Sequence, residues 1–109
     1  MAPTSFLFDE SGLATIDRPV FLYYAEDDIV LLPVANVLHI APLMRTVVGI
    51  EMIPRGGHYV FMAPCSPRLV DAAPDICGET AGVDRAEVHD RINADALAFF
   101  RRSLDLPSP

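Results

Sequence analysis

Residues 19–25 read Pro-Val-Phe-Leu-Tyr-Tyr-Ala, and this run decides the fold class because it is continuously apolar and rich in β-branched and aromatic side chains. Polar residues 17–18 precede it, and the acidic residues Glu26, Asp27 and Asp28 follow it. A strand without polar alternation is typical of a parallel sheet whose two faces are covered by helices. The run therefore predicts a buried strand that ends at an acidic turn.

Two further elements follow this strand along the chain. Residues 33–44 predict a helix that starts at Pro33 and is limited by Pro42. Its apolar positions at helical spacing are Val34, Val37, Leu38, Ala41 and Met44. Residues 46–53 predict a second strand, stopped by residues 54–57, whose two glycines permit backbone angles that other residues resist. The order strand, helix, strand predicts a parallel α/β sheet with a right-handed crossover.

The second half of the chain predicts a proline-rich loop and a closing helix. Residues 63–82 contain three prolines and both cysteines, with at most a short helical turn over residues 66–73. Asp84 and Glu87 fit a capping box at the start of the final helix. Its apolar face contains Val88, Ile92, Ala96, Phe99 and Phe100, and Arg101 and Arg102 complement the negative end of the helix dipole.

Composition bounds the class of protein. A chain of 109 residues, 51% hydrophobic and 21% charged, is expected to fold as a single unit over residues 1–109. The net charge of -7 disfavours nucleic acid as a partner, because it repels phosphate backbones. The eight Lys and Arg positions are all arginine. The absence of lysine excludes a Schiff-base lysine and the lysine of a P-loop as functional groups of these residues. No apolar window is long enough for a membrane span.

The cellular compartment and the state of the two cysteines are linked. Residues 1–12 lack the basic start and long apolar centre of a secretory signal, so the chain as written is expected to be cytoplasmic. A periplasmic or secreted protein is expected instead if an export signal lies upstream. Cys65 and Cys77 are compatible with one disulfide or with two buried thiols, and export would favour the disulfide.

The acidic turn and one histidine form a candidate catalytic pair. His58 follows the second predicted strand, and the carboxyl ends of neighbouring parallel strands meet at one edge of a sheet. A carboxylate bonded to one imidazole nitrogen fixes the tautomer and leaves the other nitrogen to activate a hydroxyl or water. Asp28 is the favoured acid. The alternatives are that Asp27 is the acid, or that the acidic turn is solvated and has no catalytic role. For His58, the alternative to a catalytic base is a loop residue that packs beside Tyr59.

The order acid then histidine matches the second half of the Ser, Asp, His order of α/β-hydrolases. The stretches FLFDESGLATIDRPVFLYYAEDD, GGHYVFMAPCSP and GVDRAEVHDRINADALAFFRRSL, with a Pro-x-Ile-Cys turn at residues 74–77, resemble the C-terminal portion of dienelactone hydrolase-like proteins. The family pattern Gly-x-x-Asp, then Pro, falls on Ala25, Asp28 and Pro33, with alanine in place of the usual glycine. The resemblance implies an α/β-hydrolase fold, hydrolysis of a carboxylic ester or lactone by Asp28 and His58, and no metal or organic cofactor.

The nucleophile of such an enzyme is missing from these residues. None of the five serines lies in Gly-x-Ser-x-Gly, and no cysteine precedes Asp28. We therefore expect a hydrolase segment, from a truncated reading frame or a split enzyme, whose sheet is incomplete. Its expected partner is a second copy of the chain or the missing upstream segment, with a small ester as substrate of the complete enzyme. The rival hypothesis is a non-catalytic oligomerisation or interaction module derived from a hydrolase.

Other residues predict no separate site. His58, Cys65, Cys77 and His89 lack the short ligand spacings of structural zinc sites. His39 and His89 fall in predicted helices, where packing or solvation is the simpler role.

Overall fold

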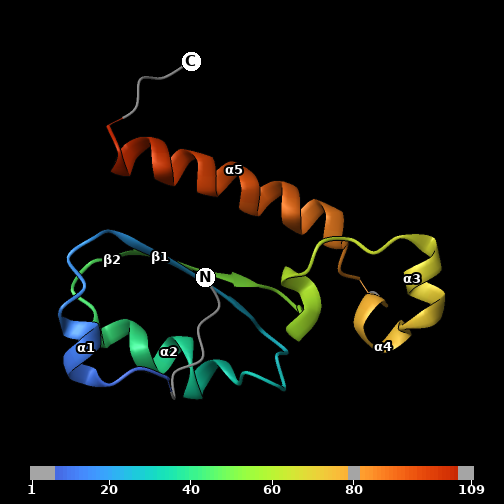
Figure 1. Cartoon of the computed structure of the whole chain (residues 1–109), viewed down its shortest axis with the longest axis horizontal. Coiled ribbons are helices and arrows are strands. Elements are labelled where there is room, and N and C mark those ends of the chain that lie inside the picture. The colour runs from blue at the N-terminus through green and yellow to red at the C-terminus, as the bar shows by residue number, and fades with distance from the viewer. Residues whose placement is uncertain (1–6, 79–81, 106–109) are drawn as a thin grey trace. The chain divides into compact units, whose positions relative to one another are not determined.

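The computed structural model describes residues 7–78 and 82–105 (Figure 1). Contacts between residues divide the chain into two compact units, residues 1–58 and residues 59–109. The first unit contains the sheet and both predicted catalytic residues.

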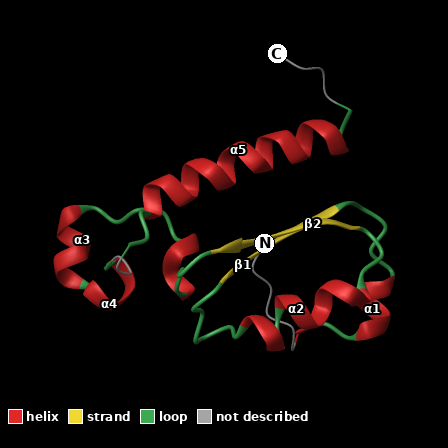
Figure 2. Ribbon diagram, turned by 180° about the vertical axis from the view of Figure 1, so that it is seen from behind, coloured by secondary structure: helices red, strands yellow, loops and turns green. Residues whose placement is uncertain are grey.

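A two-stranded parallel sheet organises the first unit. Strands β1 (Val20–Ala25) and β2 (Val47–Ile53) pair in parallel and are drawn in yellow in Figure 2. The register runs from Val20 opposite Val47 to Ala25 opposite Ile53, with an irregularity after Val20. Both predicted strands are confirmed, and so is the coarse class of helices combined with an incomplete parallel sheet.

The crossover between the strands is broken into short turns, so the prediction of one helix over residues 33–44 is wrong. It consists of the 3-10 turns η2 (Pro33–Ala35) and η3 (Ala41–Leu43) on either side of the four-residue helix α2 (Val37–Ile40). Pro42 has no N–H to continue the helical hydrogen bonds. The backbone of Asn36, with φ -121° and ψ -100°, separates η2 from α2. As a result Ile40 is buried, whereas Val34 and Leu38 are exposed.

The core of the first unit lies between β1 and the crossover. Helix α1 (Glu10–Ala14) adds a buried residue to it, and the cluster consists of Leu13, Leu22, Val37, Ile40, Ala41 and Met44. Asp9 caps α1 by accepting hydrogen bonds from the backbone N–H of Gly12 and the hydroxyl of Ser11, and these bonds lower the pKa of Asp9. Both α1 and α2 lie beside the sheet (Figure 1).

The second unit is helical. The turn η4 (His58–Phe61) begins at the boundary, and α3 (Pro67–Ala72) confirms the short helical turn predicted in the proline-rich segment. A further short helix, α4 (Pro74–Cys77), was not expected. The predicted closing helix is α5 (Arg85–Ser103), and the Asp84 carboxylate caps it by accepting from the backbone N–H groups of Ala86 and Glu87.

The Phe21 ring on β1 packs against Gly49 on β2. This residue pairs with Phe21, and a Cβ atom at position 49 would overlap the Phe21 ring. We expect Gly49→Ala to lower the free energy of unfolding by about 1–3 kcal/mol, because the ring must be displaced. Urea unfolding followed by circular dichroism measures this loss. In a Phe21→Ala background the same substitution should cost much less, and an equal loss in both backgrounds would contradict this account.

Candidate active site

Asp28 lies in the turn that follows β1, with its carboxylate buried. Its side chain is 5% exposed. Carboxylate Oδ1 accepts hydrogen bonds from the backbone N–H groups of Val30 at 2.9 Å and Leu31 at 2.7 Å. These bonds fold the segment back on Asp28 as an Asx-type turn, which fixes the orientation of the carboxylate.

His58 is presented by the turn that follows β2. The residue in the left-handed region of this turn is Arg55, with φ 55°, and not either of the two glycines, which would permit such angles. Gly56 has a different role, since a Cβ atom there would lie 2.9 Å from Cγ2 and 3.2 Å from the carbonyl oxygen of Ile53. The turn is therefore tight because its backbone packs closely against the end of β2.

The two loops bring Asp28 and His58 into direct contact. His58 Nδ1 lies 3.0 Å from Oδ2 and 3.2 Å from Oδ1 of Asp28, although the residues are 30 positions apart in the chain. An ionised carboxylate only accepts hydrogen bonds, so we assign the proton to Nδ1. In the neutral ring Nε2 is then the nitrogen that can accept a proton. The imidazole remains partly accessible, with 28% of the side chain exposed.

Asp27 does not take the place of Asp28. Its side chain is exposed, and its backbone N–H donates to the carbonyl of Gly56 at 2.9 Å. Asp28 is thus the member of the acidic turn that meets the histidine.

The backbones of the two loops are also bonded to each other. The N–H of Glu26 donates to the carbonyl of Ile53 at 3.1 Å, which extends the pairing of the strands by one residue. The Glu26 side chain then accepts a hydrogen bond from the Arg55 N–H at 2.8 Å. Sequence reasoning missed this role of Glu26, and its position within the acidic turn was the available signal.

An apolar surface adjoins the acidic turn. An open hollow is lined by Tyr24, Glu26, Asp27 and Asp28, and by Ile29, Leu32, Pro33, Val34 and Leu38. Several of these apolar side chains are well exposed, with Ile29 at 85% and Val34 at 74%. Exposed apolar side chains therefore lie beside the acidic turn.

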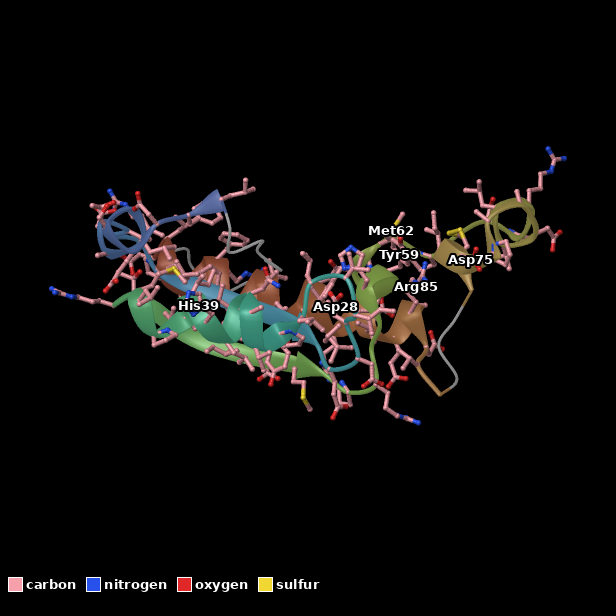
Figure 3. The ribbon with its side chains drawn as sticks, turned by 90° about the horizontal axis from the view of Figure 1, so that it is seen from below. Asp28, His39, Tyr59, Met62, Asp75 and Arg85 are labelled. Atoms are coloured by element: carbon pink, nitrogen blue, oxygen red, sulfur yellow. A yellow bond between two sulfur atoms is a disulfide. The ribbon has the colours of Figure 1, made fainter. Side chains whose placement is uncertain are left out.

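The structure also shows the surroundings of the other candidate residues. Cys65 and Cys77 form a disulfide. His39 is exposed on α2, away from Asp28 (Figure 3), and His89 on α5 has Nε2 3.2 Å from the carbonyl oxygen of Val60. Ser11 donates to Asp9, while Ser5 and Ser108 lie outside the described residues. Within the described part of the chain, no group of three or more His, Cys, Asp or Glu side chains is placed to hold a metal ion.

Buried Arg85 supports the disulfide-bearing segment. It is 5% exposed, and its guanidinium donates from Nη2 to the carbonyls of Ile76 at 3.0 Å and Gly78 at 3.3 Å. Nη1 lies 4.0 Å from the sulfur of Cys65. These contacts join the start of α5 to the end of α4 and explain why a charged residue is buried there.

Comparison of the chain with protein-family models, with curated proteins and with solved structures found no significant match. Across residues 7–78 and 82–105, every helix is too short or too polar to traverse a lipid bilayer.

The hydrogen bonds of Asp28 predict how its loss affects stability. We expect Asp28→Ala to lower the free energy of unfolding at neutral pH by about 1–3 kcal/mol, because it leaves two backbone N–H groups and the imidazole without their acceptor. Asp28→Asn should cost less, since its amide oxygen can still accept from the backbone. Asp27→Ala is the matched control and should change stability by less than about 0.5 kcal/mol. Equal losses for Asp27→Ala and Asp28→Ala in urea unfolding would contradict the assignment.

Proposed function

We propose that this chain supplies the acid and the base of an α/β-hydrolase triad that cleaves a carboxylic ester or lactone. The observation that supports the proposal is the contact of 3.0 Å between His58 Nδ1 and Asp28 Oδ2 across the loops that follow two paired parallel strands. The resemblance of the surrounding sequence to dienelactone hydrolase-like proteins indicates the same chemistry.

Each residue has a distinct role in this reaction. Asp28 holds the His58 ring by Nδ1 and stabilises the imidazolium. Nε2 of His58 takes the proton of the nucleophile hydroxyl as its oxygen attacks the ester carbonyl. His58 then returns that proton to the departing alcohol oxygen as the carbon–oxygen bond breaks. In the second half of the reaction, His58 takes a proton from a water molecule, whose oxygen attacks the acyl carbon. The bond from that carbon to the nucleophile oxygen breaks, and His58 returns the proton to this oxygen.

The nucleophile and the oxyanion hole come from outside these 109 residues under this proposal. A serine in Gly-x-Ser-x-Gly at a strand-to-helix turn is the group that pairs with an acid and histidine in this order. Its placement upstream of Asp28 would complete the order Ser, Asp, His. Residues 1–109 alone are then expected to hold His58 in the orientation of a proton acceptor but to hydrolyse no ester.

Ester hydrolysis tests this division of roles. The purified chain should hydrolyse a short activated ester no faster than its His58→Ala variant. When expressed together with the upstream coding sequence, the protein should turn over the ester, and Asp28→Asn should lower kcat by about 10³–10⁴-fold. Asp27→Asn is the control, because Asp27 is exposed and does not contact His58.

Two outcomes would contradict the hydrolase proposal. One is an upstream coding sequence with no nucleophile motif in any frame. The other is ester turnover by the extended protein that does not respond to Asp28→Asn or His58→Ala.

A second candidate function is that of an interaction module, and the exposed apolar face of β2 favours it. Val48 is 62% exposed, Ile50 42% and Met52 36%, and these alternate residues lie on one face of the strand. Three neighbouring apolar side chains on an edge strand are typical of a surface that another chain covers.

Sedimentation velocity at micromolar concentration tests the interaction module. The chain should sediment as a homodimer, and Ile50→Glu should shift it to a monomer because a charge would be buried at the contact. Leu69→Glu on α3, a residue of similar exposure at 53%, is the matched control and should leave the dimer intact. A monodisperse monomer that binds no hydrophobic dye would exclude this function.

A further inference from the structure

We propose that Glu26 is a positioning residue that holds the histidine loop in register with Asp28, an inference that rests on the proposed hydrolase function. The Glu26 carboxylate touches neither His58 nor any reacting atom. It bonds to the backbone of the loop that carries His58, three residues before the imidazole.

The backbone of Arg55 requires such a restraint. Its φ of 55° lies in the left-handed region, which is unfavourable for a residue with a Cβ atom. In this conformation its N–H points toward the acidic turn and donates to Glu26 Oε2 at 2.8 Å. A hydrogen bond to an ionised carboxylate is stronger than one between neutral groups, so it offsets part of the cost of the strained conformation.

The position of His58 depends on this turn. Gly56 and Gly57 separate Arg55 from His58, and glycines leave the backbone more freedom than other residues do. The turn is tied to the acidic turn by two backbone bonds, Glu26 N–H to the Ile53 carbonyl and Asp27 N–H to the Gly56 carbonyl. The Glu26 side chain adds a third hydrogen bond between the two turns. It accepts from the N–H of the strained residue Arg55, which lies between Ile53 and Gly56 in the chain.

Glu26 also links the two members of the pair through one short segment. It is two residues before Asp28, whose carboxylate is fixed by the backbone of Val30 and Leu31. A displacement of the histidine turn would lengthen the Asp28 to His58 contact while leaving Asp28 in place. The expected consequence of losing Glu26 is therefore a looser Nδ1 hydrogen bond in a folded protein.

Nuclear magnetic resonance of the ¹⁵N-histidine-labelled chain measures this bond directly. In the wild type, the His58 Nδ1 proton should give a slowly exchanging downfield signal, assigned by its loss in His58→Ala. In Glu26→Ala, exchange of that proton with solvent should rise about tenfold, as expected for loss of one charged hydrogen bond. Glu26→Gln should retain the signal because its amide oxygen still accepts from Arg55. Glu26→Asp, one methylene shorter, should behave as Glu26→Ala.

Matched variants separate this inference from the proposed function. Glu51→Ala removes an exposed carboxylate from β2 and should leave the signal unchanged. A wild-type exchange rate in both Glu26→Ala and Glu26→Asp overturns the positioning role. The role is also overturned if Glu26→Gln loses the signal to the same extent as Glu26→Ala. If Asp28→Asn leaves the signal unchanged, the Asp28 to His58 bond is absent and the proposed function fails instead.

Discussion

Parallel pairing of β1 with β2 is the constraint on which the rest of the first unit depends. In a parallel pair both strands end at the same edge, so the acidic turn after Ala25 and the histidine turn after Ile53 become neighbours. The pairing requires the chain to return across one face of the sheet, and this crossover brings Val37 and Ile40 against Leu22 to form the core. Gly49 leaves room on β2 for the Phe21 ring. The core and the candidate site are therefore two consequences of one pairing.

Burial of the Asp28 carboxylate explains the structure of the acidic turn. A buried carboxylate is costly unless hydrogen-bond donors surround it, and two backbone N–H groups together with the imidazole provide them. Within the described residues, no buried side-chain nitrogen or oxygen lacks a hydrogen-bond partner. The backbone holds the carboxylate on one side, and the carboxylate holds Nδ1 of His58 on the other, so the orientation of the imidazole is fixed.

The uneven burial of the sheet bears on both proposed functions. In β1, Leu22 and Tyr23 are buried on opposite faces, whereas β2 exposes Val48, Ile50 and Met52. A sheet of two strands among the described residues is small for a strand as apolar as β1. The hydrolase proposal accounts for this by further strands outside these residues, and the interaction module accounts for it by a second chain. Both place additional protein against the sheet.

The sequence alone determined the two strands, the capped helix α5 and the proximity of Asp28 to His58, because apolar runs, capping residues and the ends of strands are local features. It failed over residues 33–44, where apolar spacing indicated one helix but Pro42 and the backbone of Asn36 divide it. It also gave no sign that the left-handed backbone conformation of this turn would fall on Arg55, beside two glycines that permit such angles. Only the tertiary structure decided the hydrogen bond of Glu26 to Arg55 and the Cys65 to Cys77 disulfide. Such contacts join segments that are separate in the chain, so they depend on where the backbone runs in space and leave no periodic signal in the sequence.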